Sequence, residues 1–336
     1  MRTPPSISRS LSAVWYGDSR LRWGLVPLAA AYRALAQLRR AAYRRELLKA
    51  VELPVPVIVV GNVSVGGTGK TPFVIWLAAE LAKRELRVGI VTRGYRGNAR
   101  DWPRVVTAAS DPREVGDEPV LLARRTGCIV VAGPDRVAAA RRLLAEQPVE
   151  VLLSDDGLQH YRLARRFEIA VVDGVRGMGN GLCLPAGPLR EPAERIREVD
   201  AIVVNGGDWG HAGVFRAQPV VTGVHRVTSG EKRTVESFKG ATVHAVAGIG
   251  NPQRFFDLLE AAGLDVLPHP LEDHAEIGSE ELTFEEPGAV LITEKDAVKC
   301  EGVAHADVWC VVVDLMFDAE KTARLMGLVL REVRGS

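Results

Sequence analysis

The feature that most constrains this fold is a segment that begins at Val57 and ends at Arg84. It reads VIVVGNVSVGGTGKTPFVIWLAAELAKR, so an apolar β-branched run is followed by a glycine-rich turn and then by apolar residues at helical spacing. A turn with this many glycines makes a poor strand or helix on its own. We therefore predict a strand at Val57–Val60, a helix at Thr71–Arg84 and a ligand-binding turn between them.

The turn matches a phosphate-binding loop with one departure. The pattern G-x-x-x-x-G-K-[ST] aligns with Ser64 to Thr71, and its first position is Ser64 instead of glycine. In such a loop the backbone N–H groups and the start of the next helix attract phosphates, the lysine reaches the β- and γ-phosphates, and the hydroxyl binds Mg²⁺. The alternative is a tight turn that is only incidentally glycine-rich. The predicted nucleotide-binding residues are Ser64, Val65, Gly66, Gly67, Thr68, Gly69, Lys70 and Thr71.

Strand-like and helix-like segments alternate along the rest of the chain. Short, almost wholly apolar runs separated by helical patterns such as Asp135–Glu146 are typical of a parallel sheet covered on both faces. We predict strands at Val57–Val60, Val88–Thr92, Cys128–Ala132, Val149–Leu153, Ile169–Asp173 and Ala201–Asn205. After the glycine-rich stretch NGGDWGHAG, a second series is predicted at Thr242–Ala247, Ala289–Thr293 and Val308–Val313, with a last helix at Ala319–Val333.

These patterns predict an α/β fold with two lobes. A chain of 336 residues is long enough for two cores. We predict a P-loop NTPase-like lobe at 51–210 with a parallel sheet, and a smaller α/β lobe at 220–315. An N-terminal basic amphipathic segment at 1–50 and a C-terminal helix at 316–336 flank them, and the helix could pack on either lobe.

Composition excludes several classes of protein. The net charge of +1 provides no general attraction to nucleic acid, so we expect no nucleic-acid partner. The four cysteines are scattered without a C-x-x-C pair, which fits a reducing compartment and predicts neither a disulfide framework nor a cysteine metal site: Cys128, Cys183, Cys300 and Cys310.

The N-terminal segment is strongly basic and amphipathic. Residues 1–50 contain ten Lys and Arg, Arg2 and Arg9 among them, against two acidic residues, a local excess of +8. Beyond Pro27, apolar residues such as Leu28, Leu35 and Leu38 recur at helical spacing. The longest uncharged stretch there, ten residues, is too short to cross a bilayer, which takes about 20. Such a helix either packs on its own domain or lies on an anionic membrane surface; the aromatic residues and the charge favour the membrane.

Carboxylates follow the strand of the segment VEVLLSDDGLQH. Asp155 and Asp156 come directly after an apolar run, so they lie at the edge of the sheet where ligands bind. One of them can hold Mg²⁺ directly or through water. Gln159 and His160 follow closely, and a histidine beside a turn carries little weight alone.

Other predicted strand ends also carry reactive side chains. The segment TRGYRG contains Arg93, VGDEP contains Asp117 and Glu118, and GNGLCLPAGPLREP is a long loop. Each has an ordinary explanation as a solvated loop, a helix cap or a helix stop. Their concentration at one edge favours a binding site, and the residues that we expect to contact substrate are Arg93, Gln159, His160, Asn180 and Arg190.

Seven motifs occur together and in order: GNVSVGGTGKTP, TRGYRG, GDEP, SDDGLQH, GNGLCLPAGPLREP, EDH and TEKDAVKC. From the basic N-terminal segment to about residue 300, the chain thus resembles the tetraacyldisaccharide 4'-kinase family of lipid A biosynthesis in Gram-negative bacteria. The resemblance implies two α/β/α lobes and ATP- and Mg²⁺-dependent phosphorylation of the 4'-hydroxyl of a tetraacylated glucosamine disaccharide 1-phosphate, giving lipid IVA. It also implies a monotopic enzyme on the cytoplasmic face of the inner membrane.

The resemblance also implies roles for individual residues. The family's base and assisting histidine fall on Asp117 and His274, and Lys70 neutralises charge on the transferred phosphoryl group. Its metal-binding aspartates fall on Asp155 and Asp156, and Thr71 and Glu191 join the predicted metal site. Members often have Phe-Pro-Asp-His where this chain has Leu-Glu-Asp-His, so the segment before His274 departs from the family pattern.

Other functions remain as alternatives. A membrane-associated switch ATPase of the partitioning type would carry an extra lysine early in the loop, where this chain has Val65. A GTPase would need N-K-x-D, and TEKD at Thr293–Asp296 has a different order. A further alternative is a kinase or ATP-dependent ligase that is not membrane-bound and packs its basic segment internally.

Overall fold

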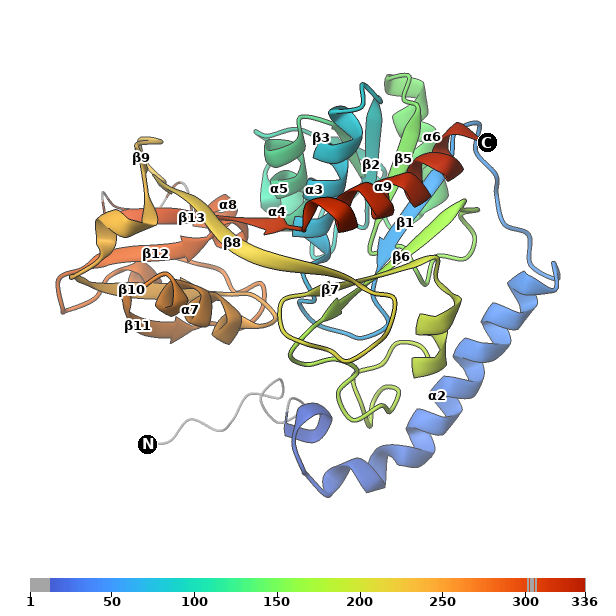
Figure 1. The fold of residues 1–336 in the computed structure, drawn as a ribbon, viewed down its shortest axis with the longest axis horizontal. Coiled ribbons are helices and arrows are strands. Elements are labelled where there is room, and N and C mark those ends of the chain that lie inside the picture. Colours follow the sequence, from blue (N-terminus) through green and yellow to red (C-terminus); the bar gives the residue numbers. More distant parts are fainter. Residues whose placement is uncertain (1–12, 301, 303–304, 306, 336) are drawn as a thin grey trace.

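The computed structural model describes residues 13–300, 302, 305 and 307–335. Residues 1–12 of the predicted basic segment, with Arg2 and Arg9, lie outside the described residues. The fold is α/β, as predicted, and its strands form a continuous path in the order β11-β10-β12-β13-β8-β7-β6-β1-β5-β2-β4-β3 (Figure 1).

The first lobe is built on a mostly parallel sheet. Its strands are β1 (Val57–Gly61), β2 (Val88–Thr92), β3 (Arg104–Val106), β4 (Ile129–Ala132), β5 (Val151–Asp155), β6 (Phe167–Asp173) and β7 (Ala201–Asn205). Only the edge strand β3 is antiparallel to its neighbour, β4. Alternate residues of β1 enter different cores: Ile58 and Val60 lie in one, and Val57 and Val59 in the other. The near-continuous apolar runs therefore reflect a sheet that is buried on both faces.

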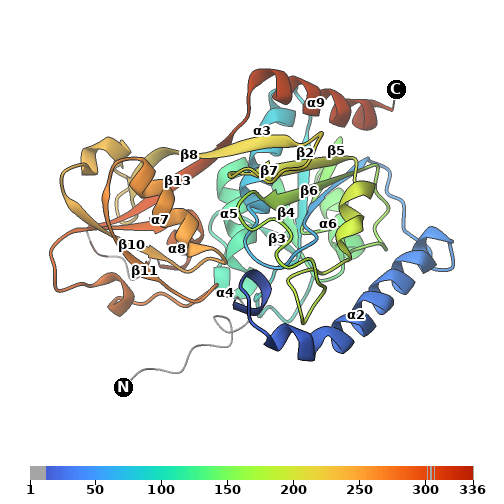
Figure 2. The same ribbon diagram turned by 60° about the horizontal axis from the view of Figure 1, so that its bottom comes forward.

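Helices cover both faces of this sheet (Figure 2). One core includes side chains from α3 (Lys70–Ala82) and α5 (Asp117–Thr126), and the other includes side chains from α6 (Arg136–Glu146). Asp135 accepts hydrogen bonds from the backbone N–H groups of Val137 and Ala138, which explains why α6 starts there. The remaining helical elements of this lobe are α4 (Pro112–Val115) and the 3₁₀ helix η1 (Ala193–Glu198).

One long strand joins the two lobes. In β8 (Phe215–Arg226), Phe215 to Ala217 pair in parallel with β7, and Gln218 to Arg226 pair antiparallel with β13 (Val308–Met316). Sequence analysis predicts no strand here, and Pro219 and Gly223 are residues that weaken a strand pattern. The predicted domain boundaries stay a prediction.

The other elements of the second lobe are β9 (Lys232–Arg233), β10 (Thr242–Ala247), β11 (Asp265–Pro270), β12 (Ala289–Thr293), α7 (Pro252–Ala261), α8 (Glu294–Cys300), η2 (Val235–Phe238) and η3 (Glu280–Leu282).

The last helix, α9 (Ala319–Arg334), returns to the first lobe (Figure 1). Leu325, Met326 and Val329 are buried in the same core as residues of α3. The preceding Phe317 packs its ring against Trp76 of α3, with 4.3 Å between the ring centroids. This packing decides which lobe the C-terminal helix contacts.

The N-terminal helix α2 (Leu21–Arg44) lies along the outside of the first lobe (Figure 2). Its only buried residue is Ala29, whereas Leu28, Leu35 and Leu38 are 61%, 67% and 68% exposed. On another face of the helix, Arg33 and Arg40 form ion pairs with Glu194 and Glu198 of η1. The helix is thus tied to the lobe by ion pairs, by the buried Ala29 and by the ring of Tyr43 beside Tyr161, and its stripe of exposed leucines faces outward, so membrane binding by this helix stays a prediction.

Candidate active site

The phosphate-binding loop leads into α3 as predicted. Gly66 and Gly69 have φ of 101° and 85°, a region that glycine enters without strain, and Lys70 and Thr71 form the first turn of the helix. Asn205 braces the loop, because its Nδ2 donates to the carbonyl oxygen of Thr68 at 3.0 Å. Free N–H groups in a helix's first turn attract anions. The loop therefore has the backbone that phosphate binding requires.

The serine at the first motif position has a structural explanation. Ser64 is buried and bridges to Leu189 in extended backbone, so a positive φ is not required there. The neighbouring N–H of Val65 donates to the carbonyl oxygen of Pro188, and that of Arg190 donates to Val63. These bonds dock the loop that contains Arg190 directly on the phosphate-binding loop.

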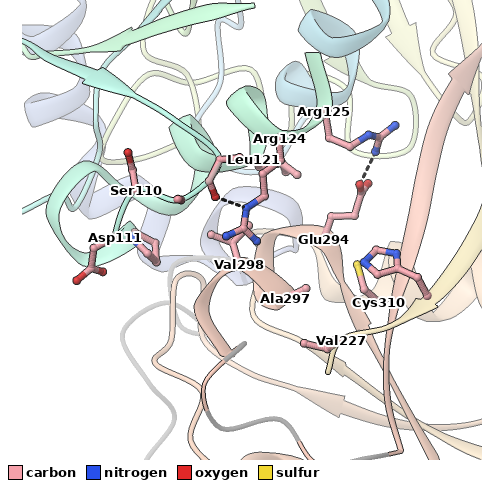
Figure 3. A pocket seen from close by; sticks show the side chains of 14 residues that line it. Ser110, Asp111, Leu121, Arg124, Arg125, Val227, Glu294, Ala297, Val298 and Cys310 are labelled. Atoms are coloured by element: carbon pink, nitrogen blue, oxygen red, sulfur yellow. Dashed lines mark hydrogen bonds and ion pairs between the residues drawn. The ribbon is translucent and has the colours of Figure 1, made fainter. Parts of the chain in front are cut away.

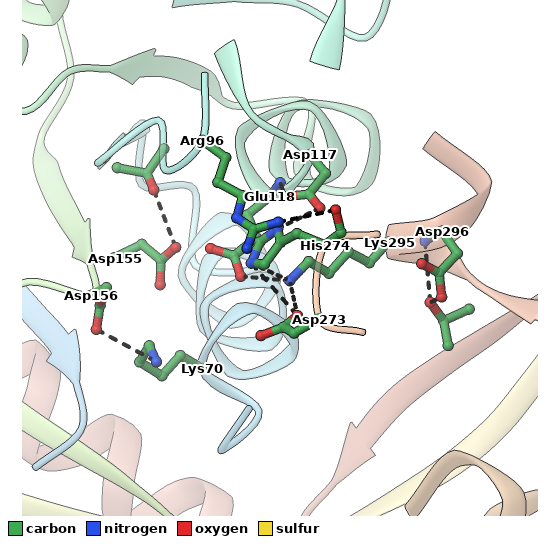
Figure 4. Close-up of polar contacts among 12 residues, drawn as sticks. Lys70, Arg96, Asp117, Glu118, Asp155, Asp156, Asp273, His274, Lys295 and Asp296 are labelled. Carbon is green, nitrogen blue, oxygen red and sulfur yellow. Dashed lines mark hydrogen bonds and ion pairs between the residues drawn. The ribbon is translucent and has the colours of Figure 1, made fainter. Parts of the chain in front are cut away.

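The two predicted metal-binding aspartates lie at the end of β5. Asp155 is buried; its Oδ2 accepts from the hydroxyl of Thr92 at 3.3 Å, and within the described residues its Oδ1 has no hydrogen-bond partner. Asp156 has a φ of 48°, and its Oδ1 lies 3.5 Å from Nζ of Lys70 (Figure 4). The same oxygen lies 2.8 Å from Nη1 of Arg190. The structure thus joins the loop lysine to the carboxylates.

Burial and neighbouring charges affect the two aspartates in opposite directions. Burial raises the pKa of Asp155, and the charges of Glu118 and Asp156 raise it further. Burial also opposes ionisation of Asp156, but Lys70 and Arg190 outweigh it and hold its pKa well below the usual range. At neutral pH Asp156 therefore carries a firmly fixed negative charge, whereas burial and the neighbouring carboxylates oppose ionisation of Asp155.

The carboxylates of Asp155 and Asp156 fit a magnesium ion only when a bound nucleotide adds its phosphate oxygens as ligands. Across the described residues, no three His, Cys, Asp or Glu side chains gather into a metal-binding group. The buried, unpartnered Oδ1 of Asp155 is nevertheless the kind of oxygen that a hard cation takes, and Mg²⁺ commonly binds one or two carboxylates plus phosphate oxygens.

Glu191 is held by other side chains. It is buried and accepts hydrogen bonds from Gln159 Nε2 at 3.1 Å and from the Tyr161 hydroxyl, and Arg195 lies 3.7 Å away. Burial raises its pKa against the hydrogen bond from Gln159 and the charge of Arg195. Gln159 also donates to the carbonyl oxygen of Asn62 at 3.0 Å, so it links Glu191 to the phosphate-binding loop.

The predicted acid–base pair is assembled across the two lobes. Asp117 begins α5 in the first lobe, His274 follows β11 in the second, and Nδ1 of His274 lies 2.9 Å from Oδ2 of Asp117. Arg96 donates to the carbonyl oxygen of His274 at 3.3 Å, which ties the histidine loop to the first lobe (Figure 4). Burial opposes ionisation of Asp117, but the hydrogen bond from His274 and the charge of Lys295 outweigh it, so its pKa lies below the usual value.

The remaining predicted substrate-binding residues differ in how they are held. Arg93 is exposed beside the ring of Tyr95, with 6.0 Å from its guanidinium carbon to the ring centroid. Burial and the charges of Arg136 and Arg93 lower the pKa of His160 to about 4, so its ring is neutral at pH 7. Asn180 donates to the carbonyl oxygens of Val14 and Ala186, so it braces its own loop.

A separate cavity of about 740 Å³ lies between α5 and α8 and contains none of the predicted site residues (Figure 3). It is lined by residues of both lobes, among them Asp111, Leu121 and Val298. Beside it Arg125 forms ion pairs with Glu294 and Asp314, which fasten α5 to the second lobe.

Sequence analysis missed two charged residues of the site. Arg136 is buried, and its Nη2 donates to the carbonyl oxygen of Asp155 at 3.1 Å. Lys295 lies 3.0 Å from Nε2 of His274. Lys295 belongs to the segment TEKD, which forms part of the family resemblance and differs in order from the guanine-binding motif N-K-x-D. An arginine at the start of a helix gives no sequence signal of burial.

Comparison with known proteins identifies the family. The profile of the family described as Tetraacyldisaccharide-1-P 4'-kinase matches residues 21–331. The chain is 49% identical over 315 residues to the tetraacyldisaccharide 4'-kinase of Nitrosococcus oceani, which covers 94% of this chain and 93% of that protein. It is 48% identical over 333 residues to the tetraacyldisaccharide 4'-kinase of Pseudomonas aeruginosa, which covers 97% of this chain and all of that protein.

A solved structure has the same fold. The crystal structure of LpxK from Aquifex aeolicus in complex with ATP matches with a TM-score of 0.77 and 30% sequence identity, covering 93% of this chain and 99% of that one. The sequence and structure matches both extend over nearly the whole length of each protein. The resemblance seen in the motifs is therefore confirmed, and the chain belongs to the tetraacyldisaccharide 4'-kinase family.

Proposed function

We propose that this protein transfers the γ-phosphoryl group of ATP to the 4'-hydroxyl of a tetraacyldisaccharide 1-phosphate, the lipid A reaction that gives lipid IVA. The observation that carries this proposal is the meeting of two groups beside α3 (Figure 4). Lys70 lies at the helix start, 3.5 Å from Asp156, and His274 of the second lobe lies 2.9 Å from Asp117 of the first. A phosphate cradle beside a carboxylate base is what a kinase with an alcohol acceptor requires.

Each residue has one task in the proposed reaction. Lys70 and Arg190 offset negative charge on the phosphates, since phosphoryl transfer depends on positioning and charge neutralisation more than on covalent catalysis. The proton of the 4'-hydroxyl passes to Asp117 as its oxygen bonds to the γ-phosphorus and the bond to ADP breaks. His274 holds Asp117 in place through the hydrogen bond at 2.9 Å.

We assign Mg²⁺ to Asp155, Asp156 and Thr71, with Glu191 in the surrounding shell. When bound, the ion supplies neutralisation of the phosphate oxygens. The unpartnered Oδ1 of Asp155 supports this assignment among the described residues. Arg93, Gln159, His160 and Arg190 are the proposed substrate contacts, and Asn180 contributes by holding the loop at 180–187.

The proposed activity predicts acceptor-dependent transfer. Purified protein with Mg²⁺, ATP labelled at the γ-phosphate and tetraacyldisaccharide 1-phosphate in mixed micelles is expected to yield a labelled lipid, resolved by thin-layer chromatography. A Lys70→Met variant should lose at least about 100-fold of this rate, because one charge contact to the transition state disappears. ATP hydrolysis at the same rate with and without the lipid acceptor, and without a labelled lipid product, would support the switch ATPase instead.

We further propose that α2 binds the anionic cytoplasmic leaflet of the inner membrane. Among the described residues, no helix has both the length and the hydrophobicity needed to span a bilayer. The exposed stripe of Leu21, Leu28, Leu35 and Leu38 supports attachment at the surface. Removing a four-chain glycolipid from the bilayer costs about 0.8 kcal/mol of free energy for each CH₂ group that becomes exposed to water, so the enzyme has to come to its substrate.

The membrane proposal predicts the effect of a triple substitution. Changing Leu28, Leu35 and Leu38 to Ser should weaken binding to phosphatidylglycerol-containing vesicles by at least about 100-fold, since burying each leucine contributes roughly 1 kcal/mol or more. Vesicle flotation measures this loss. Met316→Ser, which removes an exposed apolar side chain elsewhere, serves as the matched control and should float like the wild type. Equal flotation of all three proteins would contradict a membrane role for α2.

A further inference from the structure

Lys295 occupies a position that the assigned roles leave unexplained. It is the second residue of α8, and its side chain is 14% exposed. Its Nζ lies 3.3 Å from Glu118 Oε1, 3.3 Å from Asp273 Oδ1 and 3.0 Å from Nε2 of His274 (Figure 4). Three N–H donors of one ammonium thus face three acceptors from two segments, the start of α5 and the loop after β11.

The contact with His274 determines where the imidazole proton lies. A lysine ammonium can only donate, so Nε2 of His274 must accept and carries no proton. In a neutral imidazole the proton then lies on Nδ1, which is 2.9 Å from Asp117 Oδ2 and donates to it. The alternative, an imidazolium, would direct a second N–H at the ammonium, a contact between like charges.

We propose that Lys295 is a positioning residue, whose ammonium keeps His274 neutral with its proton on Nδ1 and so leaves Asp117 as the proton acceptor. This inference rests on the proposed function for its catalytic meaning, whereas the position of the proton follows from the contacts alone. A carboxylate that accepts one hydrogen bond from a neutral imidazole stays a better proton acceptor than one paired with an imidazolium.

The charges around His274 support this arrangement. The groups that face it are the carboxylates of Asp117 and Asp273, the ammonium of Lys295, the ring of Tyr95 with 5.3 Å between the centroids, and Arg96 at its carbonyl oxygen, while Glu118 pairs with Lys295. Burial alone lowers the pKa of Lys295, but the three neighbouring carboxylates outweigh it and hold the pKa above its usual range, so the residue stays charged at working pH. Without this ammonium, Nε2 of His274 would lose its donor and would face the carboxylate of Asp273, whose Oδ1 lies 3.6 Å away.

The position of the proton can be measured without turnover. Two-bond ¹H–¹⁵N correlation spectra of the full-length labelled protein distinguish protonated from unprotonated imidazole nitrogens, and a His274→Gln variant assigns the signals among the seven histidines. The expected result is a neutral His274 with the proton on Nδ1 at pH 7. A proton on Nε2, or an imidazolium, in the wild-type protein would overturn the proposal even if the enzyme is fully active.

Kinetics test the consequence for catalysis. Lys295→Met is expected to lower kcat by about 10–100-fold and to move the acid limb of its pH profile upward by at least about one pH unit, with KM for ATP unchanged. Lys295→Arg keeps the charge and should return the acid limb toward its wild-type position. An unshifted limb in a folded Lys295→Met variant that still binds ATP would contradict the proposal.

Lys299→Met is the matched control. Lys299 lies one turn further along α8, pairs with Asp296 at 2.7 Å and donates to the carbonyl oxygen of Ala275 at 3.0 Å, so its loss removes a nearby charge and a bond to the same loop but no contact with the imidazole of His274. Its acid limb should stay within a few tenths of a pH unit of the wild type, and an equal shift in both methionine variants would contradict a specific role for Lys295. If the spectra show the expected proton on Nδ1 but no labelled lipid forms, the proposed function fails while the assignment of the proton stands.

Discussion

Asp117→Asn is expected to lower kcat by roughly 10²–10⁴-fold while ATP affinity changes by less than about twofold. The amide is nearly the same size as the carboxylate and can still accept the hydrogen bond from His274, but it cannot take the proton of the 4'-hydroxyl. The phosphate-binding loop lies on another element, so nucleotide binding should survive. Initial rates with the lipid acceptor in mixed micelles measure the first effect, and calorimetric titration with Mg-ATP measures the second.

Asp111→Asn is the control for this substitution. Asp111 caps α4 in the same lobe, where its side chain accepts a hydrogen bond from the N–H of Arg113. Asparagine caps helices about as well as aspartate, so kcat should stay near that of the wild type. If Asp117→Asn turns over like this control and binds ATP normally, Asp117 is not the base, and the transfer needs no proton acceptor at this position.

Gly69→Ala is expected to reduce ATP affinity by more than about 100-fold, because the loop can hold its shape only without a side chain at this position. The residue has φ of 85°, and a Cβ there would overlap Nδ2 of Asn205. Asn205 cannot move freely, since it donates to Thr68 and accepts from Arg254 of α7. The substitution therefore disturbs both the phosphate cradle and the contact between the lobes, which Mg-ATP titration and thermal unfolding measure.

Gly127→Ala separates backbone strain from steric overlap. Gly127 ends α5 with φ of 63°, and nothing lies within 4 Å of its added Cβ. It should lose only about 1 kcal/mol of stability, the cost of a left-handed conformation, and bind ATP normally. Equal ATP affinity in both alanine variants would show that the phosphate-binding loop tolerates a side chain at Gly69.

Several strands and the phosphate-binding loop could be predicted from the sequence. The bounds of β2, β7, β10 and β12 agree with the predicted strands residue for residue, because each is a short apolar run bounded by polar or turn-forming residues. The glycines of the phosphate-binding loop were identifiable because their spacing relative to Lys70 follows from the geometry of one strand, one turn and one helix. Boundaries shifted by two residues at β5, where the strand continues to Asp155 itself.

Contacts between distant segments were decided only by tertiary structure. The strand β8 bridges both lobes although Pro219 and Gly223 interrupt its pattern, because partners on either side supply the pairing. The apolar stripe of α2 faces outward because ion pairs to η1 fix the opposite face, and amphipathic spacing alone describes either orientation.

The residues at the centre of the active site also divide into those that the sequence indicated and those that only the tertiary structure brought together. The resemblance to a known family suggested Asp117 and His274, but they are 157 residues apart and come together only through packing of the two lobes. Lys295 had no sequence signal of its own, since a lysine early in a helix is usually solvated. A linear pattern specifies which local structure each residue joins, whereas charge contacts between lobes depend on the three-dimensional arrangement of both.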